Sequence, residues 1–216
     1  MGTEALERYY RWHARIYDAT RWSFLFGRDR VLDGVASGPP PRSVLEIGCG
    51  TGAVLVRAAR RFPSARIVGI DLSADMLKVA ASRTRRFGDR VRLHHGAYEG
   101  PSAARLGEPA GFDCIIFSYA LSMFGDAAER AAASAAKDLS ERGRLVAVDF
   151  HRAGMAWFER WMGVNHVRMG GHAERALRDL SQASFRQECE VRRAYAGLWS
   201  YMLFSAARIP TPTTAR

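Results

Sequence analysis

The sequence predicts an α/β fold with a doubly wound sheet, because strand patterns alternate with helix patterns along most of the chain. An apolar run at 43–48 enters a turn with glycine at every second position, and an apolar helix pattern follows. The same order then recurs, which implies right-handed crossovers between parallel strands. The remaining strands are expected at 66–71, 90–95, 112–118 and 143–150, the helices at 53–62, 74–87 and 126–141, and a closing hairpin at 185–206.

The length of the chain sets the domain organisation. With 216 residues and 48% hydrophobic content, the chain can bury one core. Residues 1–40 are expected to form an extension of amphipathic cap helices, which the stiff run Gly38–Pro41 separates from the domain at 41–206. Residues 207–216 are expected to be a disordered tail.

Composition excludes several classes of protein. No apolar run approaches the roughly 18 residues of a membrane span, and the N-terminus lacks an uninterrupted signal-peptide core. The three cysteines, Cys49, Cys114 and Cys189, have neither metal nor disulfide spacing. We therefore expect a cytoplasmic protein without a metal site.

The most informative segment is Glu46-Ile47-Gly48-Cys49-Gly50-Thr51-Gly52, together with Asp71 at the end of the next strand. Glycines allow a ligand to approach the backbone closely, and a carboxylate after the second strand can accept hydrogen bonds from ribose hydroxyls. Glu46 would repel a pyrophosphate but tolerates an ammonium or sulfonium. A chance carboxylate beside a bare glycine turn is the alternative.

This segment resembles motif I of the class I S-adenosylmethionine-dependent methyltransferases, E-x-G-x-G-x-G, and the run from Asp71 to Leu77 resembles the segment that follows their second strand. The resemblance implies a Rossmann-like seven-stranded sheet whose last strand is antiparallel. It also implies S-adenosyl-L-methionine as cofactor. Glu46, Gly48, Gly50 and Gly52 would then hold its methionine part, and Asp71 its ribose.

The adenine contacts are expected on the second and third strands. Leu72 and Met76 would pack on the base, although Met76 could equally be a helix-packing residue. After the third strand, Gly96-Ala97-Tyr98-Glu99 lacks the family's usual aspartate. Either Glu99 replaces it through a shifted loop, or the backbone of Ala97 and Tyr98 contacts adenine alone.

The fourth and fifth strands supply candidates for the methyl-transfer chamber. Ser118, Tyr119 and Ser122 are expected to face it, with Ser118 close to the cofactor. His151 ends the fifth strand and is either a general base or a hydrogen-bonded structural residue. The fourth strand carries no Asn/Asp-Pro-Pro-aromatic tetrad, which argues against methylation of nucleic-acid bases.

Two segments narrow the resemblance. Residues 9–28 look like the opening of bacterial betaine-lipid N-methyltransferases, and residues 117–123 are similar to their fourth-strand segment. This implies a lipid amine substrate, diacylglyceryl-homoserine, which is converted to its trimethyl betaine lipid. Aromatic faces attract the cationic products, and Tyr17 is the first candidate for such a cage, with Tyr10 and Tyr119.

Other functions remain open at this point. A methyltransferase of a quinone precursor, of phosphatidylethanolamine or of another lipophilic molecule would share the glycine turn and an aromatic lid, here at 153–172. A protein of another class, either an RNA-binding or a catalytically silent cofactor-binding protein, would use its basic surface for partners.

Charge and the N-terminal pattern point to a membrane. The net charge is +10, nearly all from arginine, and Arg8, Arg11 and Arg15 form a stripe on an aromatic-rich helical pattern at 4–26. Such a helix suits peripheral contact with the anionic inner face of a membrane, or it caps the cofactor crevice. Nucleic acid is the less favoured partner, and the oligomeric state is left open.

Overall fold

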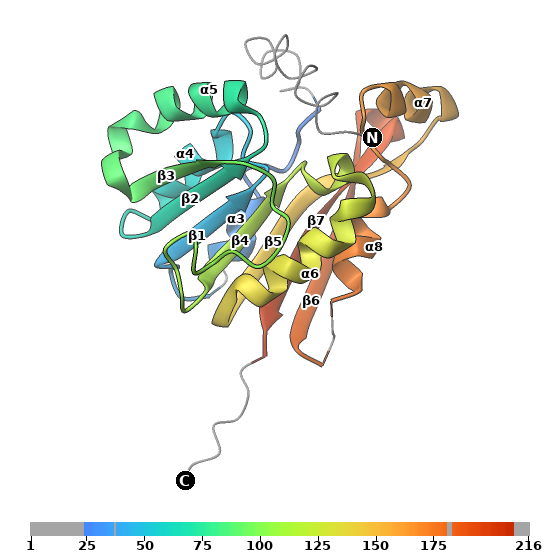
Figure 1. The fold of residues 1–216 in the computed structure, drawn as a ribbon. Coiled ribbons are helices and arrows are strands. Elements are labelled where there is room, and N and C mark those ends of the chain that lie inside the picture. The colour runs from blue at the N-terminus through green and yellow to red at the C-terminus, as the bar shows by residue number, and fades with distance from the viewer. Residues whose placement is uncertain (1–23, 37, 181–182, 210–216) are drawn as a thin grey trace.

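The structure, a computed structural model, describes residues 24–36, 38–180 and 183–209. A seven-stranded sheet with the order β3-β2-β1-β4-β5-β7-β6 forms its centre (Figure 1). Strands β1 to β5 pair in parallel, whereas β7 is antiparallel to both β5 and β6. The predicted doubly wound sheet with an antiparallel last strand is confirmed. The strands are β1 (Ser43–Ile47), β2 (Arg66–Asp71), β3 (Val91–His95), β4 (Phe112–Ser118), β5 (Leu139–Ala153), β6 (Phe185–Ala194) and β7 (Trp199–Arg208).

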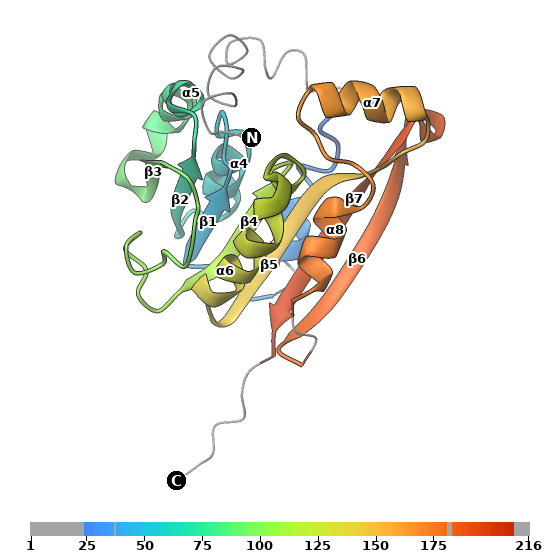
Figure 2. The same ribbon diagram turned by 45° about the vertical axis from the view of Figure 1, so that its right-hand side comes forward.

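Helices cover both faces of the sheet. Helices α3 (Val31–Ala36), α4 (Ala53–Arg61) and α5 (Ala74–Thr84) pack on one face, and α6 (Ala128–Asp138) and α8 (His172–Arg178) on the other. Helix α7 (Ala156–Val164) lies beyond one end of the sheet (Figure 2). None of the helices in the described residues is long and apolar enough to cross a membrane.

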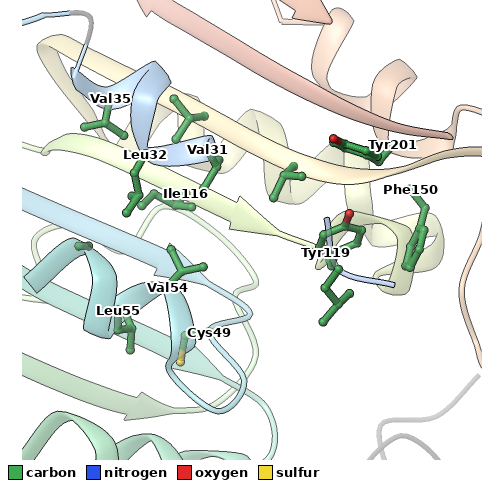
Figure 3. Close-up of a cluster of buried hydrophobic side chains, with 14 of the residues drawn as sticks. Val31, Leu32, Val35, Cys49, Val54, Leu55, Ile116, Tyr119, Phe150 and Tyr201 are labelled. Carbon is green, nitrogen blue, oxygen red and sulfur yellow. The ribbon is translucent and has the colours of Figure 1, made fainter. Parts of the chain in front are cut away.

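The two cores follow from the alternation of side chains along each strand. Because successive strand residues point to opposite faces, Val44 and Ile116 enter the core under α3 and α4, and Leu45 and Ile115 enter the core under α6 and α8. Figure 3 shows the first of these cores. All four of these residues are fully buried, which is typical of parallel strands covered on both faces.

Several predicted boundaries were wrong, and β5 also extends to Ala153 rather than ending at 150. Strand β5 begins at Leu139 rather than at 143, and α6 accordingly ends at Asp138 rather than at 141. Leu139 is extended, buried and paired with Phe112, so the chain passes from helix to strand without a loop. The helix expected at 74–87 ends at Thr84 and continues as a 3₁₀ helix (Arg85–Arg90), where Gly88 has a φ of 56°.

The ends of the predicted domain differ in how far the structure describes them. Strand β7 runs to Arg208, two residues beyond the expected boundary at 206. The helical pattern at 4–26 lies outside the described residues except for its last three positions, and so does the tail from 210 onward. Tyr17 and the arginines at 8, 11 and 15 are therefore not described.

Candidate functional site

A cavity of about 660 Å³ opens where β1, β2 and β4 end. This is the position at which parallel sheets of this kind bind ligands, because the connections diverge from β1 and β4 to opposite faces. Most of the predicted site residues line the cavity. They are Glu46, Gly48, Gly50, Asp71, Leu72, Met76, Ala97, Tyr98, Ser118 and Tyr119.

The three glycines of the turn all have positive φ angles, but the space around Gly50 differs from that around the other two. A Cβ on Gly48 would lie 2.7 Å from that of Ala120, and one on Gly52 would lie 3.0 Å from that of Ala80 on α5. A Cβ on Gly50 would meet no protein atom within 4 Å. Only Gly50 therefore leaves open cavity space for a ligand, and Gly52 does not line the cavity.

Asp71 joins the glycine turn to the end of β2. Its Oδ2 accepts a hydrogen bond from the backbone N–H of Gly50 at 2.7 Å, and its Oδ1 accepts one from Ser73 at 2.9 Å. Burial raises the pKa of Asp71, and these two hydrogen bonds oppose that rise. Each carboxylate oxygen keeps acceptor capacity for a second donor, such as a hydroxyl of a ligand.

Glu46 is a buried carboxyl on the cavity wall. Its Oε2 has no hydrogen-bond partner among the described residues. Burial raises its pKa to about 8, and the positive charge of Arg28 opposes this rise. A carboxyl in this state gains free energy from a cationic donor that enters the cavity.

Arg28 is a cavity residue that the sequence reasoning missed. Its Nε is buried without a hydrogen-bond partner in the described part of the chain. Arg28 lies close enough to Glu46 to lower its pKa, so this region of the wall contains both an acidic and a basic side chain. Its only sequence signal was its place at the end of the segment 9–28, where it was one arginine among many.

Tyr119 follows β4 and holds the segment before α3 against the cavity. Its hydroxyl donates a hydrogen bond of 2.7 Å to the backbone oxygen of Phe26, and its ring meets that of Phe150 edge-on at 4.7 Å (Figure 3). Burial raises the pKa of Tyr119 well above its ordinary value. Its φ of 56° is uncommon for a non-glycine residue and marks a strained position beside the site.

The two serines near the end of β4 are placed differently. Ser118 lines the cavity, and its buried hydroxyl has no partner among the described residues. Ser122 is fully buried and does not line the cavity, although it was expected to face it. Its backbone N–H donates to the buried Asp149 at 3.1 Å, which fixes the loop after β4.

His151 is not among the residues that line the cavity. Its Nε2 lies 2.8 Å from Oε2 of Glu174 on α8, and its Nδ1 lies 3.2 Å from Oγ of Ser200 on β7. Both ring nitrogens are therefore engaged between two elements of the fold. These contacts are those of a hydrogen-bonded structural residue.

The cavity also carries a basic rim that the sequence reasoning did not identify. Arg130 on α6 and Arg168 after α7 both line the cavity. Arg168 forms a 2.6 Å ion pair with Asp126, which also lines the cavity, and this pairing lowers the pKa of Asp126. His166 belongs to the same part of the wall.

Helix α7 presents apolar side chains to solvent close to this rim. Trp157 is 59% exposed and Val164 is 78% exposed, and Met155 and Trp161 are also exposed. Gly163 of the same helix lines the cavity. Monomeric proteins rarely leave several large apolar side chains together on the surface.

No group of three or more histidine, cysteine, aspartate or glutamate residues within the described ranges could hold a metal ion. The polar side chains of the cavity wall include carboxylates, arginines, Ser118, Thr51 and His166.

Known proteins with similar sequences include several methyltransferases. Residues 44–143 match the sequence profile of a family described as a methyltransferase domain. The chain is 36% identical over 118 residues to the nocamycin O-methyltransferase of Saccharothrix syringae, and covers 40% of that protein. It is 29% identical over 140 residues to the demethylmenaquinone methyltransferase of Thermus thermophilus, and covers 60% of it. These matches take in 52% and 62% of this chain, and because they cover 40% and 60% of the two relatives, the chain spans less than two thirds of either.

Solved structures extend the likeness over most of the chain. The geranyl diphosphate C-methyltransferase of Streptomyces coelicolor superposes with a TM-score of 0.65 at 17% identity, over 84% of this chain and 75% of that one. At that identity the likeness is one of fold. The chain thus has an α/β fold shared with S-adenosylmethionine-dependent methyltransferases, and its residues 44–143 match the profile of a methyltransferase domain.

Proposed function

We propose that this protein is an S-adenosylmethionine-dependent N-methyltransferase that methylates the amine of a lipid headgroup, converting diacylglyceryl-homoserine to its trimethyl betaine lipid. The observation that carries the lipid part of the proposal is the exposed apolar surface of α7 next to the rim of the cavity. An amphiphile could place its headgroup in the cavity while its chains stay on that surface or in a bilayer.

The cavity fits the cofactor. S-adenosylmethionine carries an ammonium, a carboxylate, two ribose hydroxyls and an adenine, and when bound it supplies an electrophilic methyl group. Glu46 and Arg28 provide opposite charges for the amino and carboxylate groups, and both have a buried polar atom that lacks a partner within the described residues. Asp71 would accept hydrogen bonds from the ribose hydroxyls, and the open space next to Gly50 would leave room for the ligand.

The adenine side of the cavity is formed by apolar side chains and backbone groups, and Glu99 of the loop after β3 also lines the cavity. Leu72 and Met76 line it from the end of β2 and the first turn of α5, and Ala97 and Tyr98 line it from the loop after β3. Flat apolar surfaces suit a purine ring. We assign these four residues to adenine. No carboxylate stands at the sequence position where the family usually has an aspartate after the third strand.

The acceptor amine must lose its proton before it can attack. The cavity wall excludes water from the attacking nitrogen and holds it in line with the methyl carbon, which supplies most of the acceleration for an already activated donor. Tyr119 lies on the wall, and its aromatic face would attract the methylated ammonium products. Tyr17 stays a prediction for the same role.

Membrane contact follows from the same proposal. The protein carries a net charge of +10, and anionic lipid headgroups attract arginine at about 1 kcal/mol per residue near the surface. Tryptophan and other apolar side chains on α7 would then enter the interfacial region. We infer peripheral binding to an anionic inner leaflet.

The experiment that tests this function is the transfer of labelled methyl from S-adenosylmethionine into purified diacylglyceryl-homoserine and into a total lipid extract. The expected result is label in a headgroup that gains up to three methyl groups. Label that remains entirely in water-soluble or RNA fractions, in a preparation that binds the cofactor, would overturn the lipid proposal.

A second candidate is methylation of a quinone precursor. The specific observation in its favour is the match of 140 residues to the demethylmenaquinone methyltransferase of Thermus thermophilus. The same extract decides between the two, because label in a quinone band rather than in an amine headgroup would favour this candidate.

A further inference from the structure

The basic rim of the cavity is supplied by parts of the chain that the cofactor does not need. Arg130 belongs to the second turn of the helical segment that starts at Gly125, and Arg168 follows α7. The glycine turn, the end of β2 and the loop after β3 form the wall that we assign to the cofactor. Arg130 and Arg168 are thus available for the second substrate.

The charges of this rim do not cancel. Arg168 uses Nη1 for its ion pair with Asp126, and its guanidinium has further N–H donors. Asp126 and Arg130 are four residues apart, which places them on the same side of one helical stretch. Arg130 has no hydrogen bond or ion pair with any described residue, so this rim carries two arginine charges and only the one paired carboxylate of Asp126.

We propose that Arg130 and Arg168 bind an anionic group of the acceptor, a carboxylate or a phosphate that lies beside its amine, and thereby select anionic over neutral acceptors. This inference rests on the proposed function, because it names the chemistry by which the acceptor would be recognised. Guanidinium groups bind carboxylates and phosphates through paired, charge-assisted hydrogen bonds. Such a bond would hold the headgroup at a fixed depth, with its chains toward α7.

The position of the rim explains why the anion belongs to the acceptor. The cofactor's own carboxylate has a closer candidate in Arg28, which lies beside Glu46 in the wall. Arg130 and Arg168 are both exposed to solvent at the opening, on the side of the cavity that α7 borders. A group that reaches them must enter from the surface, as a headgroup would.

The test compares a short-chain diacylglyceryl-homoserine with its methyl ester, which keeps the amine and removes the negative charge. Dissociation constants are measured by calorimetry in the presence of S-adenosylhomocysteine, for the unaltered protein and for Arg130→Gln and Arg168→Gln. The ester changes the basicity of the amine, but this effect cancels when the acid-to-ester ratio is compared between proteins. Short-chain phosphatidylethanolamine serves as the phosphate-bearing acceptor.

We expect the acid to bind more tightly than the ester, and this preference to fall by at least about fivefold in each variant. Arg142→Gln is the matched control, because Arg142 is exposed near the start of β5 and does not line the cavity. Its acid-to-ester ratio should equal that of the unaltered protein. A phosphate acceptor that shows the same dependence, and a carboxylate that does not, would assign the site to phosphate.

Two results would overturn the inference. One is that both the acid-to-ester ratio and the affinity for short-chain phosphatidylethanolamine are unchanged in the two cavity variants, and the other is no binding of any anionic acceptor. Methyl transfer to the same compounds separates this inference from the proposed function. Methyl transfer without a charge preference would support the proposed function but contradict the role of Arg130 and Arg168. Arginine-dependent binding without methyl transfer would support the role of these arginines but contradict the proposed function.

Discussion

Tyr98 donates a hydrogen bond of 2.6 Å from its hydroxyl to Oδ2 of Asp138, which joins the cavity loop after β3 to the last residue of α6. The same buried carboxylate accepts hydrogen bonds from the backbone N–H groups of Ser102 and Ala103. Burial raises the pKa of Tyr98, and the bond to Asp138 raises it further. The loop that we assign to adenine is therefore held from outside the cavity.

Asp138→Asn should weaken this loop. An amide offers one acceptor oxygen in place of two, so either the Tyr98 hydroxyl or a buried N–H loses its acceptor, at a cost of about 1 to 3 kcal/mol in the free energy of unfolding. Denaturant unfolding measures the loss, and binding of S-adenosylhomocysteine should weaken with it. Asp89→Asn, at an exposed position, is the control. Equal stability of the two variants would contradict the role of Asp138.

Asp71→Asn should lower cofactor affinity by about tenfold or more, because hydrogen bonds to a charged acceptor contribute roughly 1.5 to 3 kcal/mol. Calorimetric titration with S-adenosylhomocysteine checks this. The control is Asp75→Asn, since Asp75 lies nearby on α5 but does not line the cavity. An unchanged dissociation constant for Asp71→Asn would refute the placement of the ribose.

Glu46 makes stability depend on pH. Its pKa is raised to about 8 in the folded protein from an ordinary value of 4.5, so the folded state binds more protons between these values. The free energy of unfolding of the cofactor-free protein should therefore fall as pH rises through this window, by up to about 1.4 kcal/mol per pH unit.

Glu46→Gln should abolish that part of the pH dependence. Burial raises the pKa of Asp149 to about 6, so Asp149 is mostly ionised above about pH 6.5. Between about pH 6.5 and 8, the titration of Glu46 therefore contributes more to the pH dependence than that of Asp149. Thermal unfolding at several pH values compares the two proteins. Identical slopes over this range would show that Glu46 is already ionised in the folded state.

His151→Gln should affect stability more than catalysis. The substitution disturbs the contacts to Glu174 and Ser200, and we expect a loss of about 1 kcal/mol in the free energy of unfolding. The pH profile of methyl transfer should keep its shape. Loss of an ionisation from that profile, with unchanged stability, would instead restore His151 as the general base.

Trp157→Ser should weaken binding to vesicles of anionic lipid by about tenfold, because most of this side chain is exposed apolar surface on α7. Co-sedimentation with vesicles measures the effect. Ile209→Ser removes an exposed apolar side chain just after β7 and should bind as the unaltered protein does. A similar loss in both variants would show that α7 has no special part in membrane contact.

The sequence predicted the sheet well because its information is local. Strand β4 and the glycine turn each consist of a continuous run whose residues share one role, so spacing alone places them. The boundary between α6 and β5 was misjudged for the opposite reason. Leu139 is extended because it pairs with Phe112, which is distant in sequence.

The same distinction separates the predicted from the missed cavity residues. Glu46 and Asp71 stand at fixed distances from a motif, whereas Arg28, Arg130 and Arg168 reach the cavity from three separate segments. Nothing in their immediate neighbours distinguishes them from the other arginines of a basic chain. His151 was expected at a strand end but lies within β5, and its sequence position did not reveal that Glu174 and Ser200 would contact its ring nitrogens.

The packing of Phe26 has a consequence for how the protein is made. Its ring contacts those of Tyr195, Trp199 and Tyr201 at centroid distances of 5.6, 5.8 and 6.3 Å, so the segment that carries Arg28 rests on the C-terminal hairpin. That hairpin leaves the ribosome after β1 to β5 have been synthesised. A nascent chain can therefore form the glycine turn early, but it completes the cofactor wall only once β7 has emerged.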